Sequence, residues 1–274
     1  MSDSRPVGIL DSSLGGLSVC REMARLMPGE RMVYLGDTAG APLGNRSAEV
    51  IKDVARKTAV ALLENNIKMM VIACDTIAAV AYETIESVVK DIPVIGGVMP
   101  CARAAALRTG NRKVGLIGTS ATIRSGAFSN ALQRIDESVQ IHEQATPLFH
   151  ALVEELILDH DITRLTAQFY LYEMIDLGVD CLILGSSCLS PLMEVIQGTV
   201  GTGMQLIDSA LWTAKEAQDI LTALDLRHES SAGGIDGSRF IVTQKPVDEA
   251  RITGAYFGGQ LPSLELRAQK QEAG

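Results

Sequence analysis

The feature that most constrains this fold is a repeated alternation of short apolar runs with longer stretches of helical periodicity. Apolar runs of the length typical of buried parallel strands lie at residues 7–10, 32–35, 69–73, 94–95, 114–117 and 181–184. Helical patterns lie between them, at residues 15–27, 47–65, 77–89, 102–108, 125–134 and 163–177. This alternation predicts an α/β fold, with helices on both faces of mainly parallel sheet.

Small polar clusters follow several of these predicted strands. They occupy residues 11–13, 36–38, 74–76, 118–120 and 185–188. The ligand crevice of an open parallel sheet lies outside the carboxyl ends of its strands. We therefore expect these clusters to converge on a site.

The chain also contains a faint internal repeat. Residues 7–13 resemble residues 114–120 at an offset of 107, and residues 71–76 resemble residues 183–188 at an offset of 112. One interpretation is a pair of similar lobes with a ligand between them. The other is that the small residues at strand ends look alike in any α/β protein, and the repeat alone leaves both open.

Composition narrows the class of partner. The 274 residues carry a net charge of -9 without a long Lys/Arg run, which argues against nucleic acid. No window is apolar over the roughly 18 residues of a membrane helix, and the first ten residues show no secretory signal, so we expect no membrane partner and a cytoplasmic protein. The five cysteines contain no CxxC pair, which predicts neither disulfides nor a metal site.

Cys74 is the cysteine most suited to chemistry, because it ends a predicted strand and precedes a predicted helix. The positive end of a helix dipole lowers the pKa of such a thiol, so we prefer a functional role to that of a small apolar filler. Cys20, Cys101 and Cys181 lie within or beside apolar runs and are expected to pack in the core.

Several motifs resemble those of glutamate racemases, within the aspartate/glutamate racemase superfamily. In chain order they are DSSLGGL at 11–17, YLGDT at 34–38, VIACDT at 71–76, PVIG at 93–96 and GTSATIRSG at 118–126, with shorter matches at 207–210 and 257–258. The resemblance therefore extends from residue 7 to about residue 258.

This resemblance implies two similar α/β lobes, each with a mainly parallel sheet flanked by helices, and an active site in the cleft between them. The first lobe would comprise residues 1–98 and 208–274, and the second residues 99–207. The implied activity is cofactor-independent racemisation of an acidic amino acid, in the metabolism that supplies peptidoglycan. Because the motifs resemble those of glutamate racemases, glutamate is the implied substrate. The small-molecule substrate is the expected partner, and a homodimer is a further expectation.

The resemblance also implies roles for individual residues. Cys74 would be the base of the first lobe, Asp11 its acid/base assistant and Glu154 a carboxylate of the second lobe. The implied substrate contacts are Ser12, Leu43, Gly44, Asp75, Thr76, Thr119, Thr122 and Ser187.

The second lobe departs from the family pattern. The family motif G-C-T-H-Y-P corresponds to GSSCLSP at residues 185–191, so that Ser186 takes the place of the second cysteine and Cys188 that of the histidine. A one-residue insertion would instead move Cys188 towards the thiol position. Both residues are therefore candidates for the second catalytic group, although an unactivated hydroxyl is a poor base.

Two departures affect the predicted substrate pocket. Asp75 stands where the family has Asn, and Leu43 where it has Tyr. A carboxylate beside a substrate carboxylate weakens binding unless one of them is protonated or an ammonium pairs with it.

Three functions remain open from the sequence. The first is an acidic amino-acid racemase, the second an enzyme that uses Cys74 alone on another small carboxylate, and the third a catalytically silent binding protein. His150 precedes Glu154 by one helical turn, and we expect it to be a surface residue rather than a substitute base.

Overall fold

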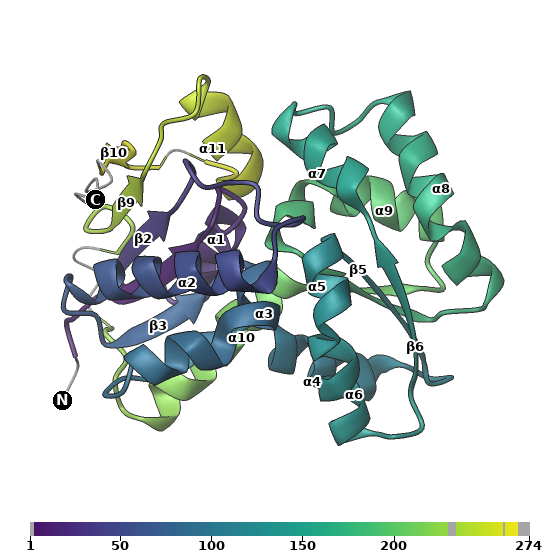
Figure 1. The fold of residues 1–274 in the computed structure, drawn as a ribbon, viewed down its shortest axis with the longest axis horizontal. Helices are drawn as coiled ribbons and strands as arrows, with labels where there is room; N and C mark the ends of the chain where they lie inside the picture. The colour runs from purple at the N-terminus through teal and green to yellow at the C-terminus, as the bar shows by residue number, and fades with distance from the viewer. Residues whose placement is uncertain (1–2, 230–233, 260, 268–274) are drawn as a thin grey trace.

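The computed structural model describes residues 3–229, 234–259 and 261–267 and contains two parallel sheets flanked by helices (Figure 1). The larger sheet has the strand order β10-β9-β2-β1-β3-β4. Its strands are β1 (Val7–Asp11), β2 (Met32–Gly36), β3 (Met69–Ile72), β4 (Val94–Gly96), β9 (Arg239–Val242) and β10 (Glu265–Leu266). The smaller sheet has the order β6-β5-β7-β8. Its strands are β5 (Lys113–Gly118), β6 (Gln140–Ala145), β7 (Cys181–Gly185) and β8 (Gln205–Asp208).

Helices surround each sheet, and the two groups lie side by side in Figure 1. Around the larger sheet are α1 (Leu17–Leu26), α2 (Ala48–Leu63), α3 (Asp75–Val88), α10 (Ser209–Ala223) and α11 (Glu249–Phe257). Around the smaller sheet are α4 (Val98–Arg108), α5 (Ser120–Ser125), α6 (Ala127–Ile135), α7 (Pro147–Glu154), α8 (Asp161–Asp176), the 3₁₀-helix η1 (Ser187–Leu192) and α9 (Met193–Val200). The predicted two-lobed α/β fold is confirmed.

The central strand β1 shows why helices must cover both faces. Successive side chains of a strand point to opposite faces, and every residue of β1 is buried. Ile9 packs into the core that includes α1 and α10, whereas Leu10 packs into the core that includes α2 and α3. Because both faces of the strand are buried, residues 7–10 form a continuous apolar run, and the one polar residue, Asp11, stands at the carboxyl end.

The six predicted strands are present, and the predicted helix at 125–134 corresponds to α6. The separate short helix α5 before it was not predicted; Gly126, with a left-handed φ of 65°, ends α5 and divides the two helices. The sequence also gave no signal for β6, which is an edge strand whose side chains are exposed or half-buried and therefore need not be apolar.

Strand register confirms the internal repeat. In the larger sheet Val7 pairs with Met69, and in the smaller sheet Val114 pairs with Cys181. These partners lie 107 and 112 positions later, the two offsets found in the sequence. Ser186, which follows β7, therefore occupies the place in the second sheet that Cys74 occupies after β3.

The boundaries of the two lobes, 1–98 with 208–274 and 99–207, stay a prediction, and residues 268–274 lie outside the described residues. Among the helices of the described ranges, none is long and apolar enough to cross a membrane.

Candidate active site

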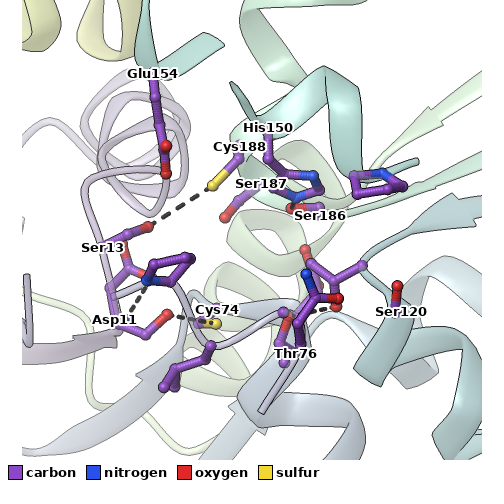
Figure 2. A pocket seen from close by; sticks show the side chains of 18 of the residues that line it. Asp11, Ser13, Cys74, Thr76, Ser120, His150, Glu154, Ser186, Ser187 and Cys188 are labelled. Atoms are coloured by element: carbon purple, nitrogen blue, oxygen red, sulfur yellow. Dashed lines mark hydrogen bonds between the residues drawn. The ribbon is translucent and has the colours of Figure 1, made fainter. Parts of the chain in front are cut away.

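A pocket of about 200 Å³ gathers the carboxyl ends of strands from both sheets (Figure 2). Asp11 ends β1, Cys74 follows β3, Thr119 follows β5 and Ser186 follows β7. The volume lies below the roughly 300–1,000 Å³ of sites for drug-sized ligands, so the pocket suits a small metabolite. Four of the five polar clusters expected to converge here line the pocket, whereas the cluster at 36–38 does not.

Cys74 lies at the N-terminus of α3, as the sequence predicts, and its sulfur is 3.1 Å from the Ser12 hydroxyl. The predicted direction of its pKa shift is wrong. Burial, followed by the negative charge of Asp11, raises the pKa of the Cys74 thiol to about 12, although the Ser12 hydrogen bond lowers it. Desolvation of the thiolate therefore outweighs the helix N-terminus, and the resting group is a neutral thiol.

Three hydrogen bonds hold the buried carboxyl group of Asp11 in place. Its Oδ2 accepts hydrogen bonds from the Tyr34 hydroxyl at 2.7 Å and the Gly16 amide at 2.8 Å, and its Oδ1 accepts one from the Ser12 amide at 2.8 Å. Burial raises the pKa of Asp11, and these three donors lower it. The carboxyl group is thereby fixed in position beside the thiol.

Asp75 is buried, and its carboxyl group accepts a hydrogen bond from the Ser209 hydroxyl at 2.7 Å. Burial is the main cause that raises its pKa to about 7. At neutral pH and below, much of this side chain is an uncharged acid, which resembles the Asn of the family pattern in charge. The repulsion expected between Asp75 and a substrate carboxylate is reduced accordingly.

Hydrogen bonds join the two lobes around the pocket. The Thr76 and Thr119 hydroxyls are 2.9 Å apart, and the Ser187 hydroxyl donates to the Ala73 carbonyl oxygen at 2.8 Å. Thr122 does not line the pocket, but its hydroxyl lies 2.8 Å from that of Thr119. These bonds fix the strand ends of one sheet relative to those of the other.

The hydroxyl group of Ser186 contacts the imidazole of His150, which lies on α7. Nε2 of His150 lies 3.1 Å from the Ser186 hydroxyl oxygen, and Nδ1 lies 3.3 Å from the Thr146 carbonyl oxygen. His150 is half-buried and lines the pocket, so the expectation that it is a surface residue is wrong. The sequence could not reveal the contact, since Ser186 is distant in the chain and a helical turn at 150–154 does not show what it packs against.

Cys188, the second residue of η1, also lines the pocket and is half-buried. Its sulfur is 3.7 Å from the Ser13 hydroxyl, and no room is left for a Cβ at Gly15 beside it. Burial and the charge of Asp11 raise the pKa of Cys188 to about 12. Figure 2 shows its sulfur directed at Ser13, with Ser186 and His150 on its other side.

The charges of the pocket are mostly acidic. Asp11, Asp75 and Glu154 line it, and no Lys or Arg is found among its described lining residues. Glu154 is exposed, yet partial burial and then the neighbouring Glu155 raise its pKa. An anionic ligand must therefore be held by amides and hydroxyls or bring a positive charge of its own.

The structure brings together all but one of the residues singled out from the sequence. The pocket is lined by Asp11, Ser12, Leu43, Gly44, Cys74, Asp75, Thr76, Thr119, Glu154, Ser186, Ser187 and Cys188, whereas Thr122 lies behind Thr119. Cys20, Cys101 and Cys181 are buried in the core as expected. Within the described ranges, no group of three or more His, Cys, Asp or Glu side chains is arranged to hold a metal ion.

The sequence profile of the Asp/Glu/Hydantoin racemase family matches residues 7–217. This chain belongs to that family. Among similar racemases, the glutamate racemase of Geobacter metallireducens is 37% identical over 97% of this chain and 99% of its own length. The glutamate racemase of Chlorobaculum parvum is 35% identical over 97% of both chains.

Solved racemase structures agree with this assignment. The glutamate racemase of Francisella tularensis in complex with D-glutamate superposes with a TM-score of 0.90 at 28% identity, covering 97% of this chain and 98% of that one. The glutamate racemase of Thermus thermophilus in complex with beta-chloro-D-alanine gives 0.86 at 33% identity, covering 98% of each chain.

Proposed function

We propose that this protein is a cofactor-independent glutamate racemase. The observation that carries the proposal is the pocket between the two sheets, in which Cys74 from one lobe shares a small cavity with Ser186 and Cys188 from the other. Racemisation needs such a pair of groups, because a proton must leave one face of the α-carbon and another must arrive on the opposite face.

Cys74 is the proposed acid/base group of the first lobe. As a thiolate it removes the α-proton, and the electron pair of the broken C–H bond remains on the α-carbon. A group of the second lobe then gives a proton to the other face. The same steps in reverse convert the other enantiomer, with Cys74 acting as the acid.

The pocket supports the ionic form of glutamate. Asp11 and Glu154 offer carboxylates to the α-ammonium group, and the Ser12, Thr76 and Thr119 hydroxyls offer hydrogen bonds to carboxylates. The first turn of α3 adds backbone amides beside Cys74. Pairing the ammonium group and fixing the carboxylates also stabilises the carbanionic transition state.

The test follows α-proton exchange in deuterium oxide by proton NMR, with each enantiomer of glutamate and aspartate. We expect glutamate to exchange and to invert, with product stereochemistry read by chiral chromatography. Cys181→Ala is a matched control, because Cys181 is buried in the core outside the pocket. Absence of exchange with both glutamate enantiomers would refute the proposal.

The cellular location and the oligomeric state are two further properties to propose or test. We propose a cytoplasmic location, because all five cysteines are free and a reducing compartment keeps them so. The homodimer implied by the family resemblance stays a prediction, which sedimentation velocity would check.

A further inference from the structure

The second lobe holds a pair of side chains that the family motif does not contain. Strand register places Ser186 at the position equivalent to Cys74, and the imidazole of His150 touches its hydroxyl. Both side chains line the pocket that Cys74 lines. The position expected to hold a second thiol thus holds a hydroxyl in contact with a base.

The surroundings of His150 fix the direction of this hydrogen bond. The Thr146 carbonyl oxygen can only accept, so Nδ1 of His150 carries the proton and donates it there. Nε2 is then left with its lone pair and accepts the hydroxyl proton of Ser186 at 3.1 Å. An imidazole oriented in this way is the usual means by which proteins activate a serine hydroxyl.

We propose that Ser186, with His150 as its proton acceptor, is the acid/base group on the second face of the substrate. This inference rests on the proposed racemase function. His150 acts through Ser186 and needs no contact with the substrate.

The proton transfers balance without any further reactant. Ser186 Oγ takes the α-proton while its own hydroxyl proton passes to Nε2 of His150, and the C–H electron pair stays on the α-carbon. Cys74 gives its thiol proton to the opposite face and becomes a thiolate. The opposite enantiomer reverses these steps: the thiolate removes the proton, and the imidazolium of His150 restores the proton that Ser186 delivers.

The geometry favours this pair over Cys188. The Cys188 sulfur lies beside the Ser13 hydroxyl and against Gly15, both in the first lobe, which already supplies Cys74. From the second lobe the Ser186 hydroxyl also bonds to it and lowers the pKa of Cys188, so Cys188 lies beside the proposed pair. Its position in η1 is two residues beyond the one that matches Cys74. The described side chains within hydrogen-bonding distance of its sulfur include no imidazole that could accept its proton.

The decisive variant is His150→Gln. Glutamine can keep a hydrogen bond to Ser186 but cannot take up a proton, so we expect kcat to fall by about 10²–10⁴-fold with little change in KM. Exchange of the α-proton facing Cys74 should persist in deuterium oxide, without inversion. His160→Asn is the matched control: His160 caps α8 outside the pocket by accepting from the Ile162 amide, which asparagine can also do.

A second variant separates proton transfer from structure. A thiol is more acidic than a hydroxyl and needs no imidazole to give up its proton. We therefore expect Ser186→Cys to keep racemisation, and the double variant Ser186→Cys/His150→Gln to regain most of the activity that His150→Gln loses. A merely structural role for His150 would give a double variant as weak as the single one.

The outcomes distinguish the two proposals. Wild-type protein that neither exchanges nor inverts glutamate refutes the racemase function itself. If the wild type is active, two results overturn the Ser186–His150 assignment. One is a kcat of His150→Gln within threefold of the wild-type kcat, and the other is a Ser186→Cys variant that folds but is inactive. Loss of inversion in Cys188→Ala together with its retention in Ser186→Ala also overturns the assignment, and would make Cys188 the second group.

Discussion

The ends of β3 and β7 have the same place in their sheets but different chemistry. After β3 stands the Cys74 thiol, whose neighbour is the Ser12 hydroxyl at 3.1 Å. After β7 stands the Ser186 hydroxyl, whose neighbour is the His150 imidazole at 3.1 Å. A thiol needs only a weak partner to transfer a proton, whereas a hydroxyl needs a base. The difference teaches that a backbone repeat can be kept while the side chain at the strand end and its hydrogen-bond partner both change.

The largest effect should come from removing the thiol of the first lobe. Cys74→Ser leaves a hydroxyl without an imidazole, so kcat/KM for glutamate should fall by about 10⁴-fold, towards the upper limit for a general acid/base group. Circular dichroism of glutamate at a fixed wavelength measures the rate from each enantiomer. If Cys74→Ser is about as active as the Cys181→Ala control, Cys74 is not the group that transfers the proton on its face of the substrate.

A smaller effect should follow from removing the helper of Cys74. The Ser12 hydrogen bond lowers the pKa of the thiol, so Ser12→Ala should raise that pKa further and reduce kcat/KM about tenfold. Because the equilibrium constant of racemisation is 1, the reduction must be equal from both enantiomers. Ser13→Ala is the comparison variant, since the Ser13 hydroxyl lies near Cys188 rather than Cys74. An equal or larger fall in Ser13→Ala would point to Cys188 instead.

The third effect depends on pH and concerns Asp75, whose counterpart in the second lobe is the uncharged Ser187. The pKa of Asp75 is raised to about 7, so its side chain is neutral below that pH and negative above it. Binding of glutamate should therefore weaken as pH rises through 7, with KM increasing about tenfold between pH 6 and 8.5. In Asp75→Asn this increase should disappear. Steady-state kinetics over that pH range measure KM. If KM of Asp75→Asn rises with pH as steeply as that of the wild type, Asp75 is not the cause of the increase.

The smallest effect concerns the contact that holds the two strand ends together. Ser187→Ala removes the buried hydrogen bond to the Ala73 carbonyl oxygen and should lower the free energy of unfolding by about 1–3 kcal/mol. Urea denaturation measures this change. Ser87→Ala removes an exposed hydroxyl that bonds only within α3, and should change stability by less than about 0.5 kcal/mol. Equal changes in both variants would show that the contact between lobes adds nothing.

The parts of the site that the sequence revealed are those with local signals. Asp11 and Cys74 stand at the ends of apolar runs, and the carboxyl ends of parallel strands meet at one edge whatever the rest of the chain does. The pKa of Cys74 was predicted in the wrong direction, because a helix N-terminus is visible in the sequence while burial depends on the whole fold.

His150 shows the opposite case. The role we propose for it depends on Ser186, which lies 36 residues away and on a different element. No periodicity links the two, and the helical turn that the sequence indicates at 150–154 does not show where α7 packs. The sequence predicted that separate strand ends meet, but not that α7 meets one of them.

The acidic lining of the pocket has a consequence for selectivity among metabolites. A dicarboxylate that lacks an amino group, such as glutarate or 2-oxoglutarate, brings two negative charges into a cavity with Asp11 and Glu154 and with no Lys or Arg among its described lining residues. Glutamate brings an ammonium group that offsets this repulsion. We therefore expect the pocket to bind glutamate more tightly than either of these dicarboxylates.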